Sequence, residues 1–153
     1  MAEEILAYRL GPSSSFSPQE VFEYHFEHLK KYKQLLFTTK TDIKTPTSCK
    51  EIMFVNQDKN QCFKAFINGS GRFQANNDNL QAVKGYNVPK QFKDSLNEDI
   101  EKGYRWFALS AENVSIEPFS KGKYCLSRID LIDSLGENQT PHRYVLPAVT
   151  SNK

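Results

Sequence analysis

The chain carries two apolar runs about a short polar loop: EIMFVN at 51–56 and CFKAFIN at 62–68, separated by QDKNQ at 57–61. Apolar runs of this length that flank a short polar segment are typical of a β-hairpin. The sequence NGSG at 68–71 then predicts an abrupt end to the second arm, because asparagine and glycine favour turns. This hairpin is the best in the chain.

Further strand signals lie on both sides of the hairpin. Short apolar or aromatic runs predict strands at 5–10, 35–39, 104–109, 114–116, 124–129 and 143–146. The stretch 72–88 is rich in Asn and Gln with weak periodicity, and it predicts a long loop with at most one helical turn. We expect one domain over 1–146 and a flexible tail over 147–153.

Two helices interrupt these strands. The first is predicted to begin at Ser17, because Ser17 and Glu20 have the spacing of a capping box and Pro18 occupies the first helical position. Its apolar stripe consists of Phe22, Phe26, Leu29 and Tyr32.

A second helix is predicted over 89–102, where Phe92, Leu96 and Ile100 make a narrow stripe and Gly103 supplies a C-cap. Strands dominate the middle and the C-terminal part, without regular βαβ alternation. The pattern therefore favours a single-domain α+β fold with a barrel-like sheet and two helices.

Composition excludes several classes of protein. The 153 residues are 39% hydrophobic and 12% aromatic, enough for a core, so wholesale disorder is excluded. A formal net charge of +2 is that of neither a polybasic tail nor an acidic DNA mimic, although a local basic patch is compatible with it. No apolar run approaches the ~20 residues of a membrane span, so no membrane partner is expected.

The cysteines and the N-terminus indicate a cytoplasmic protein. The three cysteines are widely spaced and odd in number, which favours reduced thiols over a disulfide framework. Cys62 and Cys125 lie in strand-like runs and are expected to act as small core residues. The start of the chain, MAEE, lacks the features of a signal peptide.

Motifs for catalysis are missing from the sequence. It has no Walker loop, no G-x-S-x-G elbow, no C-x-x-C pair and no H-E-x-x-H helix. His25 and His28 could approach one metal ion, but a third ligand would have to come from elsewhere. Asp130 and Asp133 do not match the acidic pattern of a nuclease. We therefore assign no catalytic residue, no metal site and no cofactor, and expect a protein that is not an enzyme.

Aromatic and basic residues alternate at several places, and this pattern is the main positive signal. Aromatic faces stack on bases while Arg and Lys neutralise phosphates, so nucleic-acid surfaces place both types together. For each cluster taken singly, a half-buried sheet that turns its lysines to water is the better explanation. The candidate nucleic-acid-binding residues are Trp106, Tyr104, Arg105, Lys64, Arg72, Phe73, Lys90 and Lys93.

A family resemblance rests on the order of these segments. The predicted helix is followed by LFTT at 36–39, the hairpin arms IMFV at 52–55 and FKAFI at 63–67, and YRWFAL at 104–109. Over about 35–129 the chain resembles the PUA-like superfamily, in its EVE, YTH and ASCH group. The resemblance implies a small mixed or antiparallel β-barrel with a pocket for a base, often modified, that is flipped out of DNA or RNA. The aromatic cage of that family has no residue-by-residue match here, and Trp106 is the only tryptophan.

These observations favour a nucleic-acid-binding module, with DNA preferred over RNA as the partner. In the family, some members are recognition modules of modification-dependent restriction systems, so a specificity domain of a restriction or defence protein, within a larger complex, is the expected role. The alternative is a non-catalytic protein-interaction or adaptor domain, accessory or phage-encoded, whose aromatic residues form an apolar patch. A hydrolase or nuclease is the least favoured interpretation.

Overall fold

The structure is a computed structural model that describes residues 5–10, 16–39, 49–56, 59–73, 83–119, 124–126 and 142–147. The chain packs into two compact units built from interleaved segments. Unit 1 comprises Met1–Phe22, Thr45–Lys64 and Ser115–Lys153, and unit 2 comprises Glu23–Lys44 and Ala65–Val114. The single domain predicted over 1–146 stays a prediction.

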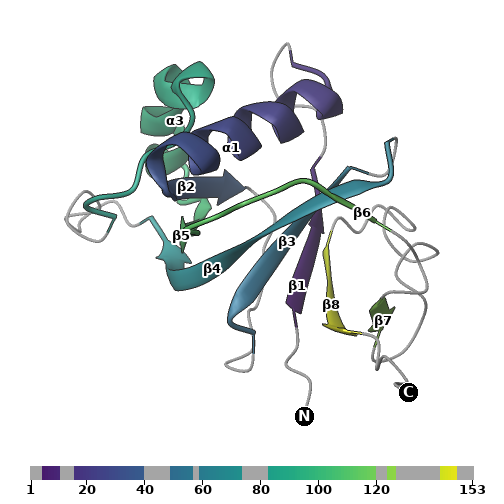
Figure 1. The fold of residues 1–153 in the computed structure, drawn as a ribbon. Helices are drawn as coiled ribbons and strands as arrows, with labels where there is room; N and C mark the ends of the chain where they lie inside the picture. The colour runs from purple at the N-terminus through teal and green to yellow at the C-terminus, as the bar shows by residue number, and fades with distance from the viewer. Residues whose placement is uncertain are drawn as a thin grey trace, which may run out of the picture. The chain divides into compact units, whose positions relative to one another are not determined.

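The described elements confirm a mixed α+β fold (Figure 1). Hydrogen-bonded strands follow the order β2-β5-β4-β3-β1-β8-β7, with β6 paired to β4. Among the described strands this path is open, and the predicted barrel is not confirmed. The elements are β1 (Ile5–Arg9), α1 (Pro18–Tyr32), β2 (Gln34–Thr39), β3 (Glu51–Asn56), β4 (Gln61–Arg72), the 3₁₀ helix η1 (Lys90–Ser95), α3 (Leu96–Glu101), β5 (Arg105–Ser110), β6 (Glu117–Pro118), β7 (Tyr124–Leu126) and β8 (His142–Pro147).

In unit 1, β1 is the central strand. It pairs in parallel with β3, from Ile5 opposite Glu51 to Arg9 opposite Val55, and antiparallel with β8. Figure 1 shows β3, β1 and β8 side by side, and β7 continues the sheet beyond β8. A parallel pair needs a long crossover connection, which the residues between β1 and β3 provide. The neighbouring strands β3 and β4 are the two arms of the predicted hairpin.

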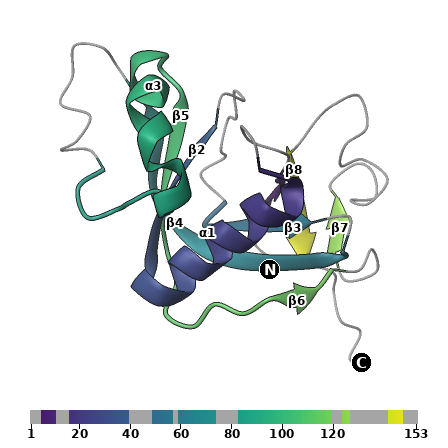
Figure 2. The ribbon, with the colours of Figure 1, turned by 90° about the horizontal axis from the view of Figure 1, so that it is seen from above.

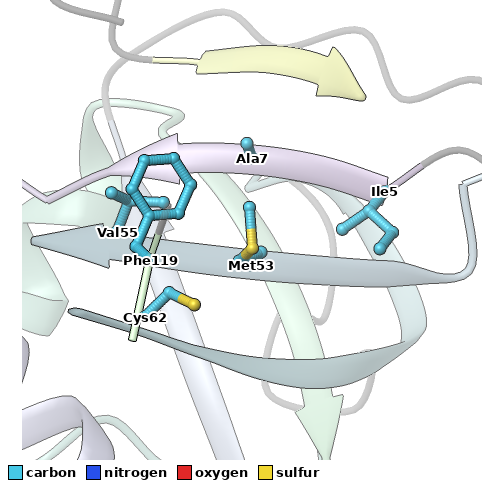
Figure 3. Close-up of a cluster of buried hydrophobic side chains, with 6 residues drawn as sticks. All are labelled: Ile5, Ala7, Met53, Val55, Cys62 and Phe119. Atoms are coloured by element: carbon cyan, nitrogen blue, oxygen red, sulfur yellow. The ribbon is translucent and has the colours of Figure 1, made fainter. Parts of the chain in front are cut away.

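Both faces of β1, β3 and the first part of β4 are buried. One face carries the cluster in Figure 3, where side chains of β1, β3 and β4 form one buried group with the ring of Phe119. The other face carries aromatic rings: the Phe63 ring centroid lies 5.1 Å from that of Phe22 on α1 and 5.2 Å from that of Phe54. Burial on both faces explains the unbroken apolar runs in the sequence. The cluster comprises Ile5, Ala7, Met53, Val55, Cys62 and Phe119.

The N-terminus of α1 confirms the predicted capping box. The Ser17 amide donates to Glu20 Oε1 at 2.9 Å, and the Glu20 amide donates to Ser17 Oγ at 3.2 Å. These two bonds satisfy amide groups that the first helical turn leaves without a partner. The predicted apolar stripe is correct for Phe22 and Leu29, which are buried, and wrong for Tyr32, which is exposed.

Unit 2 contains a three-stranded antiparallel sheet in the order β2-β5-β4. β2 pairs with β5 from Gln34 opposite Ser110 to Thr39 opposite Arg105, and the other edge of β5 pairs with β4. The turn predicted at 68–71 is wrong, because β4 runs through it to Arg72. A bulge between Ile67 and Gly69 accommodates the extra residue, so the glycines bend the strand without ending it.

Different elements pack against the two faces of this sheet. The ring of Phe37 packs near His25 of α1 and near Phe107, with centroid distances of 5.7 and 6.2 Å. The opposite face holds a second core cluster, built from the buried side chains of Leu36, Phe73 and Val83 with α3 packed against it. Figure 2 shows α3 beside β5 and β2.

The second predicted helix is present in two parts. Its first half is the 3₁₀ helix η1, and only Leu96–Glu101 is α-helical. Gly103 ends it in the left-handed region, with φ of 70°. The Gly103 amide donates to the Ile100 carbonyl at 3.2 Å, and the Tyr104 amide donates to the Asp99 carbonyl at 3.0 Å. This pair of bonds is a Schellman motif, which confirms Gly103 as the C-cap.

The remaining strand predictions agree in part. Residues 114–116 form no strand, and the short β6 follows them. β7 covers the first half of the run 124–129, and β8 contains 143–146. Residues 74–82 of the predicted loop, Asp130, Asp133 and the tail beyond Pro147 lie outside the described residues. Within the described residues, no helix combines the length and apolar character that crossing a bilayer requires.

Candidate functional site

The eight candidate residues do not form one group. Lys64 lies in unit 1, half-buried on β4. The other seven lie in unit 2, on or next to β4, β5 and η1. Within unit 2, strand pairing brings some of them together and separates others.

Trp106 lies flat on the backbone of β4. It pairs with Gly71 across the two strands. A Cβ atom at Gly71 would lie 3.0 Å from Cζ2 and 3.2 Å from Cε2 of the indole, while Gly69 has more room. The ring therefore covers the area of strand that a side chain at position 71 would occupy, an arrangement that compensates for glycine in a sheet.

The second core cluster accounts for three of the candidates. Trp106 and Tyr104 are half-buried and pack against Leu36 and Val83. Phe73 is 3% exposed and belongs to the buried part of the cluster. Its predicted role at a binding surface is therefore wrong, because its ring has no free face on which a base could stack.

Arg105 points away from Trp106. Adjacent residues of a strand project to opposite faces, so Arg105 lies on the face of Phe107. In the register of the sheet, Arg105 is directly opposite Thr39 of β2 on one side and Arg72 of β4 on the other. Two residues that are far apart in the sequence therefore form a cross-strand pair, which we call the arginine pair.

The guanidinium of Arg105 has no counter-ion in the part of the chain that the structure describes. Its Cζ lies 5.7 Å from the centroid of the Phe107 ring, which is fully buried. Its Nε is buried without a hydrogen-bond partner. Such a position is unusual for a cation, since buried polar groups nearly always have partners.

Arg72 occupies the other half of the pair and is exposed. Its Nη1 donates to the carbonyl of Gly103 at 3.4 Å, a long bond. Like charges directly opposite one another on neighbouring strands destabilise a sheet. The arginine pair places two cationic side chains opposite one another at the end of β4 and the start of β5, and their repulsion has a cost in stability.

Lys90 and Lys93 are exposed on η1. Phe92, between them, turns inward and packs against α1, with its ring centroid 5.2 Å from that of His25 and 6.3 Å from that of Tyr24. This contact positions η1 and leaves both ammonium groups in solvent. In the described segments, no hydrogen bond or ion pair joins them to the arginine pair.

The described residues contain no group of three metal-ligating side chains. His25 is buried between the rings of Phe37 and Phe92. Burial lowers the pKa of His28, and a hydrogen bond with Gln34 opposes this effect. A half-buried Asp99 accepts a 2.8 Å hydrogen bond from Thr38, and burial raises the pKa of its carboxyl group. These groups pack or cap elements of unit 2.

The arginine pair can bind an oxyanion. Guanidinium groups offer several N–H donors in a planar fork, which matches the oxygens of phosphate or carboxylate. The sequence places Arg72 and Arg105 in separate clusters, and each was predicted with an aromatic neighbour. Their pairing depends on the register between β4 and β5, for which the sequence carries no local signal.

Comparison of the chain with protein-family models, with curated proteins and with solved structures found no match. The resemblance to the PUA-like superfamily therefore stays a prediction.

Proposed function

We propose that this protein is a nucleic-acid-binding module and that the arginine pair, Arg72 and Arg105, is a contact for the polyanion. The observation that carries the proposal is the half-buried guanidinium of Arg105, which has no counter-ion among the described residues and faces a second arginine across the strands. This arrangement places two cationic side chains opposite one another across the strands, and Nε of Arg105 has no hydrogen-bond partner among the described residues. A phosphate group that contacts both side chains would offset the repulsion between them.

An extended polyanion suits unit 2 better than a small anion. Exposed lysines accompany the arginine pair in this unit, and each could neutralise a further phosphate. A string of phosphates can contact several of these cations, whereas a small anion can contact only a few. Among the described residues of unit 2, these exposed lysines include Lys30, Lys31, Lys33, Lys90 and Lys93; Lys102 is paired with Glu98 and is not counted with them.

Other parts of the sequence-based expectation are carried only by the resemblance. These are the PUA-like barrel, the pocket for a flipped or modified base, the role in restriction or defence, the larger complex and the preference for DNA. The packing of Trp106 on Gly71 gives its ring a structural role and does not support the base pocket. The barrel, the base pocket, the role in restriction or defence, the larger complex and the preference for DNA all stay predictions.

Fluorescence anisotropy with labelled single-stranded and duplex oligonucleotides tests the proposal. We expect binding at about 50 mM salt that weakens steeply by about 200 mM, because bound phosphates release counter-ions. Arg105→Gln should weaken binding about tenfold and lower the slope against log salt concentration by about 1. Arg105→Lys should recover part of the loss, since it keeps the charge without the planar fork.

Lys84→Gln is the matched control. Lys84 is an exposed cation in the 83–85 turn of the same unit and belongs to none of the paired strands, so the variant removes the same charge without changing the arginine pair. Its affinity should stay within about twofold of that of the wild type. The absence of any binding at low salt would contradict the proposal, as would equal losses for Arg105→Gln and Lys84→Gln. Salt-insensitive capture of a protein would favour the adaptor alternative.

A further inference from the structure

We infer that the arginine pair recognises the phosphate backbone without reading or stacking the bases. The inference rests on the proposed function and specifies which part of a nucleic acid this site contacts. Three features of unit 2 support this inference. They are the burial of the aromatic rings next to the pair, the side-chain conformation of Arg105, and the kinds of polar side chain near the pair.

No ring beside the pair is open to a base. Phe107 lies beneath the guanidinium of Arg105 and is fully buried, and Phe37, its partner across the strands, is 4% exposed. The tryptophan projects from the opposite face of β5, where its indole covers Gly71. Stacking on bases needs an accessible aromatic face, so this face of the sheet lacks that means of recognition.

The stretches of unit 2 outside the described residues supply no further ring. The two stretches of this unit outside the described residues, 40–44 (KTDIK) and 74–82 (QANNDNLQA), contain no Phe, Tyr or Trp. Neither of these two stretches can therefore add an aromatic side chain to the pair.

The side-chain conformation of Arg105 suits contact with a phosphate that approaches the protein surface. To read a guanine edge, an arginine must extend into a groove and present both ends of its fork. Here the side chain lies over the Phe107 ring with Nε buried, so it does not project from the sheet. A phosphate is on the outside of the nucleic acid and can reach a guanidinium held in this way.

The neighbouring polar side chains are also of the kinds that commonly contact phosphate. Ser70 pairs with Phe107 in the register and is exposed on the same face as the arginine pair. Asn68, an amide that could read a base edge, donates instead to Ser110 Oγ at 2.8 Å and to the Tyr86 hydroxyl at 3.2 Å. Serine and arginine contacts to phosphate fix position and carry no sequence information.

An abasic oligonucleotide provides the test. Single strands of equal length are compared by anisotropy: one of mixed sequence, one free of guanine, and one in which every base is replaced by a hydrogen atom on the sugar. We expect wild-type affinities within about threefold of one another, since all three carry the same phosphates. Arg105→Gln should weaken all three by the same factor, and Trp106→Phe, which keeps a ring over Gly71, should change none.

Each other outcome has a distinct meaning. Loss of more than about tenfold for the abasic strand, with the other strands bound and dependent on Arg105, would overturn the inference and leave the proposed function standing. Similar losses for the guanine-free and the abasic strands, with the mixed-sequence strand still bound, would show guanine readout and overturn it equally. If no strand binds, or if binding does not depend on Arg105, both the proposed function and this inference fail.

Discussion

The indole of Trp106 lies against the backbone of β4 because position 71 has no side chain. The glycine leaves a gap in the pleated surface, and the ring fills it from the neighbouring strand. In the sequence, a lone tryptophan within the run Tyr104-Arg105-Trp106-Phe107 is compatible with a stacking wall or with core packing. Because Gly71 lies opposite the tryptophan, the structure favours the packing role.

Gly71→Ala should therefore destabilise the protein by about 1–3 kcal/mol, the usual cost of overpacking. The new methyl group would lie 3.0 Å from Cζ2 of the indole, so the ring or the strand must shift. Urea unfolding, followed by the emission of the single tryptophan, measures both the stability and the environment of the ring. Ser70→Ala, at the exposed neighbouring position, is the control and should stay within about 0.5 kcal/mol of the wild type. Equal stability of the two variants would contradict the close packing.

At the scale of the element, local signals predict boundaries well and pairings poorly. The capping box at Ser17 and the C-cap at Gly103 are each contained in a few consecutive residues, and both are confirmed. The length of β4 was predicted wrongly because Gly69 and Gly71 indicate a turn when read alone. Their strand conformation depends on β5, which covers them with Trp106, and that partner lies more than thirty residues away.

The same reasoning applies to the candidate site. Sequence identified Arg72 and Arg105 as basic residues in strand-like runs, and it identified Trp106 as a neighbour of Arg105. Alternation along β5 separates Arg105 from Trp106, and pairing with β4 joins it to Arg72. The sequence therefore contained the residues of the arginine pair without the register that assembles them.

Gly103→Ala tests the C-cap of α3. Gly103 has φ of 70°, where an L side chain crowds the following carbonyl, and its Cβ would lie 3.4 Å from the Phe73 carbonyl oxygen. We expect a loss of about 1–2 kcal/mol in thermal unfolding. Glu101→Ala, an exposed position in the last turn of the same helix, should have an effect below about 0.5 kcal/mol. A Gly103→Ala variant as stable as its control would show that the left-handed cap is not required.

At the scale of the whole molecule, charge provides little general attraction for a polyanion. A formal net charge of +2 on 153 residues is close to neutral. Affinity for nucleic acid must then come from local groups of cations, and steering by the overall field is weak. A local site of this kind has a cost in the free protein, because the like charges that attract the ligand also repel one another.

Arg105→Met tests whether that cost is present. Methionine can cover the Phe107 ring with an apolar chain, and it removes both the unsatisfied Nε and the charge opposite Arg72. Arg105 is a half-buried cation without a counter-ion among the described residues, and an apolar residue of similar length avoids its desolvation cost. We therefore expect an unchanged free energy of unfolding or a gain of up to about 1 kcal/mol.

The same variant should lose affinity for oligonucleotides by at least as much as Arg105→Gln. Stability and binding would then change in opposite directions, as expected when a residue is retained for a ligand at the expense of the fold. Urea unfolding and anisotropy on the same preparations measure both quantities. A variant that is destabilised by more than about 1 kcal/mol would instead assign the guanidinium a structural role, since lost packing alone then explains any loss of binding.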